Sequence, residues 1–180
     1  MDKIIFLDRD GTINEDSGHV YRLRELKFIP NMAEGLKKLQ NAGYKFIILT
    51  NQAGIAKGLY HEQDYFLFRE EMHRGLKEQG IIITAEYFCP HHRDGIGKYR
   101  IDCNCRKPKT GLLEQAAKDF NLNLNDCWMI GDKNSDILAG KNAGCKTIHV
   151  LTGECKTPIN YADFIAKDLV EAADYILSQN

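Results

Sequence analysis

Two pairs of acidic residues stand out in the sequence because each pair follows a short apolar segment. Asp8 and Asp10 come directly after one such run, and Asp132 and Asp136 follow another. Residues two apart in an extended segment point to the same side, so Asp8 could attack an electrophile while Asp10 moves protons. Acidic groups beside buried strands are costly unless they are paired or bound to metal, and Mg²⁺ prefers oxygen ligands. The two pairs together predict a Mg²⁺ site with a nucleophilic carboxylate, whereas reading the first pair as a mere turn leaves the second unexplained.

A second set of candidate metal ligands lies in the middle of the chain. Cys89, Cys103 and Cys105 accompany two adjacent imidazoles, those of His91 and His92. Three thiolates and one imidazole suit tetrahedral Zn²⁺, and four protein ligands would leave no open position, so this zinc would be structural. The surrounding stretch lacks the hydrophobic periodicity to fold alone, and metal binding would supply its folding free energy. Unrelated buried cysteines are the alternative interpretation.

The elements that must position these residues alternate between strand and helix patterns. The expected strands are Lys3–Leu7, Tyr44–Leu49, Ile81–Phe88, Cys127–Ile130, Lys146–Leu151 and Asp163–Ala166. The expected helices are Asn31–Asn41, with Asn31 as the N-cap, His61–Gln79, Thr110–Phe120, Ser135–Asn142 and Asp168–Ser178. Such alternation predicts an α/β fold with a mostly parallel sheet and helices on both faces. Ligands of these sheets bind beyond the carboxyl ends of the strands, where Asp8, Thr50 and Asp132 stand.

Length, composition and charge limit the class of protein. The chain has 180 residues, 43% of them hydrophobic and 27% charged, which predicts one globular domain over residues 1–180 with the loop 89–105 inserted. A net charge of −1 argues against nucleic acid as the main partner. The apolar runs are too short to span a membrane, and the N-terminus lacks a secretion signal. We expect a cytoplasmic monomer that acts on a small molecule.

Four motifs, in order, resemble those of the haloacid-dehalogenase-like (HAD) phosphatases. They are Phe6-Leu7-Asp8-Arg9-Asp10-Gly11-Thr12, Thr50 after an apolar strand, Lys107 in Arg106-Lys107-Pro108, and Gly131-Asp132-Lys133-Asn134-Ser135-Asp136. The resemblance implies a Rossmann-like, HAD-like fold. No large cap domain fits between the motifs, so the stretch Gly11–Phe28 and the zinc loop must shape the entrance to the site.

The resemblance also implies a role for each motif residue. Asp8 would be the nucleophile that forms an aspartyl-phosphate, and Asp10 would protonate the leaving alcohol and then activate water. Mg²⁺ would be held by Asp8, the main-chain carbonyl of Asp10, and Asp132. Asp136 would support these ligands without binding the metal itself. Two residues would bind phosphoryl oxygens, whose transfer depends on positioning and charge neutralisation: Thr50 and Lys107.

The zinc loop narrows the resemblance to one subgroup of these phosphatases. Its Cys-x-His spacing favours His91 over His92, so the expected zinc ligands are Cys89, His91, Cys103 and Cys105. The subgroup includes the D-glycero-D-manno-heptose 1,7-bisphosphate 7-phosphatases, which act in nucleotide-activated heptose biosynthesis, and the histidinol-phosphate phosphatases. Eleven residues separate His91 from Cys103, a longer loop than the histidinol-phosphate enzymes have. The sequence therefore resembles the heptose enzymes more closely.

The same resemblance implies a substrate site. Its expected lining residues are Asp16, Ser17, Gly18, His19, Asn51, Gln52, Ala53, Arg106 and Lys133. Arg106 could hold a second phosphate with bidentate geometry, or it could be a solvated arginine. Three other functions compete: a histidinol-phosphate phosphatase, an inactive HAD-like binding protein, and a zinc-dependent nucleic-acid-binding module. The last explains the thiols and leaves the acidic pairs without a role.

Overall fold

The computed structural model describes residues 3–179 and contains one six-stranded sheet. Its strands are β1 (Lys3–Leu7), β2 (Tyr44–Asn51), β3 (Ile83–Cys89), β4 (Trp128–Gly131), β5 (Lys146–Val150) and β6 (Phe164–Ala166). Neighbouring strands all run parallel, in the order β3-β2-β1-β4-β5-β6. The helices are α1 (Met32–Asn41), α2 (Ala53–Ala56), α3 (Glu62–Glu78), α4 (Gly111–Phe120), α5 (Asn134–Ala143) and α6 (Leu169–Ser178). The predicted α/β fold with a parallel sheet is confirmed, and no large cap domain is present within residues 3–179.

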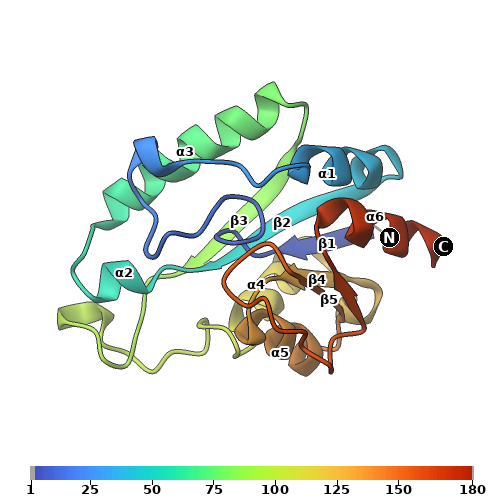
Figure 1. Ribbon diagram of the computed structural model, residues 1–180. Helices are drawn as coiled ribbons and strands as arrows, with labels where there is room; N and C mark the ends of the chain where they lie inside the picture. Colours follow the sequence, from blue (N-terminus) through green and yellow to red (C-terminus); the bar gives the residue numbers. More distant parts are fainter. Residues whose placement is uncertain (1–2, 180) are drawn as a thin grey trace.

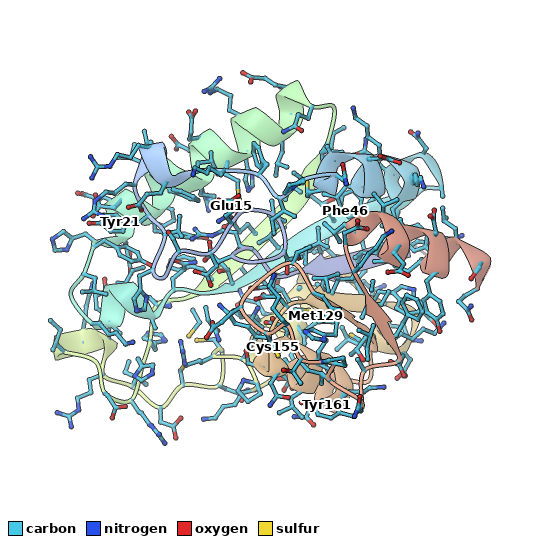
Figure 2. All side chains as sticks on the ribbon, in the orientation of Figure 1. Glu15, Tyr21, Phe46, Met129, Cys155 and Tyr161 are labelled. Carbon is cyan, nitrogen blue, oxygen red and sulfur yellow. The ribbon has the colours of Figure 1, made fainter. Side chains whose placement is uncertain are left out.

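Helices cover both faces of the sheet, as the alternation of apolar residues along the strands requires (Figure 1). Ile5 of β1 packs into the core formed with α1, α3 and α6, whereas Ile4 packs into the core formed with α4 and α5. Side chains fill both layers: Phe46 belongs to the first core and Met129 to the second (Figure 2). Both cores are buried, so the sheet is a rigid platform for the loops at its edge.

Several expected bounds differ from the structure by one or two residues, and a strand start and a helix cap show why. The strand expected from Ile81 begins at Ile83, because the Ile81 N–H donates to the Leu76 carbonyl and completes the end of α3 after Gly80. Asn31 precedes α1 but makes no side-chain capping bond. The backbone of Asn31 is left-handed, with φ of 62°, a conformation that asparagine tolerates. Asn31 contributes to the start of the helix only through its main-chain carbonyl, which accepts a hydrogen bond from the Gly35 N–H.

The topology places the carboxyl ends of three central strands side by side. β1 lies between β2 and β4, and the chain runs outward from β1 in opposite directions in its two halves, which opens a crevice at this edge. The irregular stretches 11–28 and 89–109 both lie at the edge toward which the strands point (Figure 1). Gly11 has φ of 92°, and a Cβ there would lie 2.4 Å from Asp132 Oδ2, so only glycine lets the loop after β1 pass this carboxylate.

A membrane-crossing helix would have to be longer and more apolar than any of the helices found between residues 3 and 179.

Candidate active site

Three carboxylates from two strand ends meet beside one buried ammonium group. Asp8 follows β1, whereas Asp132 and Asp136 follow β4, and each offers an oxygen within 4.8 Å of the others. Lys107 Nζ lies 2.7 Å from Asp8 Oδ1, 2.7 Å from Asp136 Oδ1 and 2.6 Å from the Leu49 carbonyl oxygen. Lys107 forms ion pairs with Asp8 and Asp136, and Lys133 acts on Asp8 and Asp132 only through its charge, so the three buried carboxylates still outnumber the cations.

The electrostatics of the cluster favour a bound cation. Burial raises the pKa of Asp8, and the Asp136 carboxylate raises it further. Burial, with the charges of Asp8 and Asp136, raises the pKa of Asp132 to about 8. The Asp132 Oδ2 atom accepts from the Glu154 N–H at 2.8 Å, while the buried Oδ1 atom has no hydrogen-bond partner. An unpartnered carboxylate oxygen in a negative cluster is a fitting ligand for a hard divalent cation.

Lys107 and Asp136 stabilise each other inside this cluster. Burial lowers the pKa of Lys107, but the charges of Asp136 and Asp8 outweigh it and leave the pKa raised. Asp136 Oδ2 accepts from the Lys133 N–H at 3.0 Å at the start of α5, so both of its oxygens have partners. This placement suits a supporting role for Asp136 behind the oxygens of Asp8 and Asp132.

The carboxylate of Asp10 is held by four hydrogen bonds. Arg9 donates through Nε to Oδ1 at 2.9 Å and through Nη2 to Oδ2 at 2.8 Å. Asn14 Nδ2 donates to Oδ1 at 2.9 Å, and Gln52 Nε2 donates to Oδ2 at 3.1 Å. Arg9 is fully buried over the ring of Phe68. The sequence analysis did not predict that Arg9 and Asn14 bind Asp10. The position of Arg9 between two aspartates at the end of a buried strand could have indicated that Arg9 pairs with one of them.

Two connected sets of residues form a narrow inner hollow and a wider entrance. The inner hollow, of about 30 Å³, is lined by Asp8, Asp10, Thr50, Asn51, Lys107, Lys133, Ser135 and Asp136. The entrance, of about 390 Å³, is lined by Asp10, Asp16, Gly18, His19, Asn51, Gln52, Ala53, Lys57, Tyr60, Arg106, Lys133, Ser135 and Glu154. A small anionic group fits the inner hollow, and the rest of a larger molecule fits the entrance.

The structure brings most of the expected substrate residues to these two spaces. Thr50 and Lys107 line the inner hollow, and all but one of the other expected residues line the entrance. The exception is Ser17, which is exposed in the turn closed by the Gly18 N–H to Asp16 Oδ1. Lys133 Nζ lies 2.7 Å from Asp16 Oδ2, and its hydrogen bond helps to lower the pKa of that carboxyl against the opposing effect of burial.

Four residues of the entrance were not expected from the sequence. They are Lys57, Tyr60, Ser135 and Glu154. Lys57 follows the helix α2, which is too short to show a periodic pattern of hydrophobic residues. The Nζ atom of Lys57 lies 3.4 Å from His19 Nε2. Glu154 reaches the site from the loop after β5, where its Oε2 lies 3.5 Å from Lys133 Nζ. Of these four residues, only Ser135 could have been expected at the site from the sequence, because it lies within the motif that begins at Gly131.

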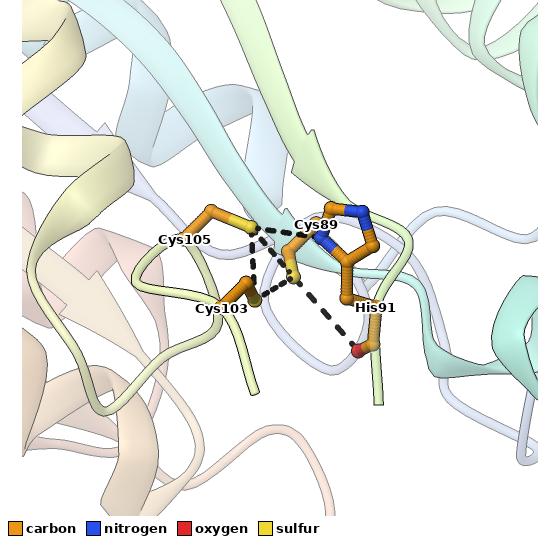
Figure 3. Close-up of side chains that lie close together, drawn as sticks. All are labelled: Cys89, His91, Cys103 and Cys105. Carbon is orange, nitrogen blue, oxygen red and sulfur yellow. Dashed lines mark hydrogen bonds between the residues drawn. The ribbon is translucent and has the colours of Figure 1, made fainter. Parts of the chain in front are cut away.

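The three thiols of the second candidate site converge on one imidazole (Figure 3). Cys105 Sγ lies 3.0 Å from Cys89 Sγ and 3.1 Å from Cys103 Sγ, and His91 Nδ1 lies 3.4 Å from Cys105 Sγ. The hydrogen bond with Cys89, with help from His91, lowers the pKa of the Cys105 thiol to about 5. His92 points elsewhere and accepts from the Asp94 N–H through Nδ1. Four ligand atoms within 4.8 Å of one another match the donor set of a structural zinc site.

Comparisons with known proteins agree with this geometry. The Hydrolase_like family model, described as HAD-hyrolase-like, matches residues 104–172. D-glycero-beta-D-manno-heptose-1,7-bisphosphate 7-phosphatase of Haemophilus ducreyi is 41% identical over 97% of this chain and 98% of its own. The alpha-heptose counterpart of Photorhabdus laumondii is 43% identical over 79% of this chain and 78% of its own.

A solved structure shares the fold over its full length. The crystal structure of D,D-heptose 1.7-bisphosphate phosphatase from B. bronchiseptica, complexed with magnesium and phosphate, superposes with a TM-score of 0.88. It is 29% identical, and the match covers 99% of each chain. Because a relative is 41% identical over nearly all of its length, this chain belongs to the HAD-like phosphatase family that includes the D-glycero-D-manno-heptose-1,7-bisphosphate 7-phosphatases.

Proposed function

We propose that this chain is a Mg²⁺-dependent phosphatase that removes the 7-phosphate from D-glycero-D-manno-heptose 1,7-bisphosphate, in nucleotide-activated heptose biosynthesis. The observation that carries the proposal is the surroundings of Asp8, which lines the inner hollow: Lys107 Nζ lies 2.7 Å from Asp8 Oδ1, and Asp132 offers a carboxylate oxygen within 4.8 Å of Asp8. The nucleophile and a cation thus line a hollow of the size of one phosphoryl group, and a metal ligand lies close to the nucleophile. The family relationship supplies the substrate class.

The acidic cluster fits the magnesium ion that the family implies. Asp8, Asp132 and the main-chain carbonyl of Asp10 would hold it, and the ion would neutralise charge on the phosphoryl oxygens. Lys107 remains beside Asp8 and supplies the second positive charge at the same place. A magnesium ion fits this cluster because its positive charge offsets the net negative charge of the carboxylates.

The residues of the inner hollow can perform the two half-reactions. In the first, an Asp8 oxygen attacks phosphorus, the bond to the sugar oxygen breaks, and Asp10 delivers a proton to that oxygen. In the second, Asp10 takes a proton from water, whose oxygen attacks the same phosphorus and releases Asp8 and phosphate. Thr50 and Lys107 hold the phosphoryl oxygens throughout, and their positions in the inner hollow support this role.

The shape of the site suits phosphate on a primary carbon. The 7-phosphate can extend into the inner hollow while the sugar occupies the entrance, where Arg106 offers a guanidinium to the 1-phosphate. We propose that the active unit is a monomer. Free thiols at the zinc-type cluster suit a reducing cytoplasmic compartment.

We also propose that Cys89, His91, Cys103 and Cys105 hold a structural Zn²⁺. The four donors leave no position for substrate, so the ion would order the loop and take no part in the reaction. Because Arg106 and Lys107 directly follow Cys105, an ordered loop places both of them at the active site.

Steady-state kinetics on four substrates would test the proposed function. We expect kcat/KM to be highest for one anomer of the heptose bisphosphate and lower for fructose bisphosphate and histidinol phosphate. The remaining product should carry phosphate on C1, which phosphorus NMR would show. Faster hydrolysis of histidinol phosphate would overturn the substrate assignment, and no hydrolysis of any ester would overturn the phosphatase assignment.

Arg106→Ala should weaken catalysis on the bisphosphate much more than on a small monophosphate that does not reach the entrance. A charge-assisted contact contributes about 1.5–3 kcal/mol, which corresponds to about 10- to 100-fold in kcat/KM. The matched control is Arg93→Ala, because Arg93 lies on the same loop but its side chain is 83% exposed. Equal losses on both substrates would place Arg106 at the reacting phosphate instead.

Asp132→Asn should raise the melting temperature of the metal-free protein and abolish its response to Mg²⁺. The folded pKa of Asp132 is about 8 against 3.8 for the free group, so its contribution to stability is present at low pH and is lost as pH rises from about 4 to 8. Mg²⁺ at 100 times Kd should stabilise the wild type by about 2.7 kcal/mol, raising Tm by about 5–10 °C. Thermal scans at pH 8 would show this, and an equal Mg²⁺ shift in Asp132→Asn would contradict it.

A further inference from the structure

The side-chain amide of Gln52 links the proposed proton donor to a buried tyrosine. Gln52 Nε2 donates to Asp10 Oδ2 at 3.1 Å and to Thr50 Oγ1 at 2.8 Å, so both of its hydrogens are used. Gln52 Oε1 accepts from the hydroxyl of Tyr60 at 2.5 Å. Gln52 is 2% exposed and Tyr60 is 4% exposed, so both side chains are almost wholly buried.

The hydroxyl of Tyr60 favours one of the two orientations of this amide. The carboxylate of Asp10 only accepts hydrogen bonds, and it therefore requires the nitrogen of Gln52 to face it. In that orientation the amide oxygen faces Tyr60, whose hydroxyl donates to it. Burial raises the pKa of Tyr60, so the hydroxyl remains protonated over the working pH range.

The ring of Tyr60 is itself held in place by two neighbours. Tyr21, from the loop after β1, stacks on it with ring centroids 4.6 Å apart and an interplanar angle of 14°. On α2, a Cβ at Gly54 would lie 2.0 Å from Tyr60 Cε1, so the ring packs directly on the backbone of that helix. Tyr60 is therefore a fixed support, and it transmits its position to Asp10 through a single amide.

We propose that Tyr60 is a positioning residue that acts through Gln52 to orient the Asp10 carboxyl for protonation of the leaving oxygen. The proposal rests on the proposed function, in which Asp10 is the acid. Tyr60 transfers no proton: the proton passes from Asp10 to the oxygen released from phosphorus. Without the tyrosine hydroxyl the amide can turn over, and its oxygen would then repel the Asp10 carboxylate.

The dependence of the rate on the leaving group separates this role from a merely structural one. A poor leaving group such as an alkyl alcohol needs the proton from Asp10, whereas 4-nitrophenolate leaves without one. We expect Tyr60→Phe to lower kcat/KM for an alkyl phosphate by about 2- to 10-fold, the effect of one hydrogen bond. Hydrolysis of 4-nitrophenyl phosphate should change by less than about twofold on the same scale.

The test measures kcat/KM for 4-nitrophenyl phosphate, phenyl phosphate and an alkyl phosphate in the Mg²⁺-loaded enzyme. Tyr21→Phe is the control, because Tyr21 belongs to the same aromatic stack but contacts no atom of the Gln52 amide by hydrogen bond. Gly54→Ala is an independent variant: the added Cβ displaces the ring while keeping the hydroxyl, and it should give the same leaving-group-dependent loss.

A steeper dependence on leaving-group pKa in Tyr60→Phe and Gly54→Ala, with Tyr21→Phe unchanged, supports the positioning role. Equal losses on all three esters, or no loss, would overturn it. If Tyr60→Phe proves unstable by its melting temperature, the Gly54→Ala profile alone decides. An inactive wild type would instead overturn the proposed function itself.

Discussion

Replacing Asp8 by asparagine is expected to abolish turnover while the fold remains intact. The amide cannot easily form the acyl-phosphate, and it is a poorer ligand for Mg²⁺ than the carboxylate. Loss of the nucleophile should lower kcat by about a thousandfold or more. Stability should not fall, because burial and the Asp136 charge raise the pKa of Asp8 despite its contact with Lys107, and a neutral amide avoids the cost of burying that charge.

Steady-state rates on the bisphosphate and thermal scans of both proteins would test this. Asp102→Asn is the matched control, since the Asp102 side chain is 81% exposed and pairs with Lys109 outside the site. Mass spectrometry must show that the introduced asparagine has not deamidated, because a trace of restored aspartate would mimic residual activity. Substantial turnover by the folded, undeamidated variant would reject the covalent mechanism.

Cys103→Ser is expected to reduce bound zinc from about one ion per chain to almost none. Three remaining ligands hold the ion far less tightly, and the loop 89–105 then loses the free energy that orders it. A loss of about 3 kcal/mol would lower the melting temperature by about 6–12 °C. Activity should fall as well, because Lys107 follows Cys105 by two residues and its Nζ lies 2.7 Å from Asp8 Oδ1.

Metal analysis of the purified protein gives the direct measurement, and Cys155→Ser is the matched control. Cys155 lies outside the thiol cluster, with its Sγ 3.3 Å from the Thr157 carbonyl oxygen, so its replacement should keep zinc and activity. Mild EDTA should remove Mg²⁺ and turnover while zinc stays bound, and added Mg²⁺ should restore the rate. Zinc-free wild-type protein would refute this interpretation of the loop.

The parallel sheet and the residues at its strand ends could be predicted from the order of the amino acids. Alternating apolar segments predicted parallel strands, and parallel strands place Asp8, Thr50 and Asp132 at one edge. The thiol spacing likewise predicted a local cluster, because its ligands lie on one short loop. These predictions depend on the periodicity of hydrophobic residues and on the order of strands and helices, both of which can be read from residues that are close together in the chain.

The donors that contact the reacting groups could not be predicted in this way, because they come from distant segments of the chain. Lys107 lies 99 positions from Asp8, and Gln52 lies 42 positions from Asp10. No periodic pattern in the sequence predicts that Tyr60 donates a hydrogen bond to Gln52, or that Glu154 lines the entrance. Such contacts depend on how irregular loops pack against a finished sheet, and packing between distant segments is set by the whole core rather than by any local run of residues.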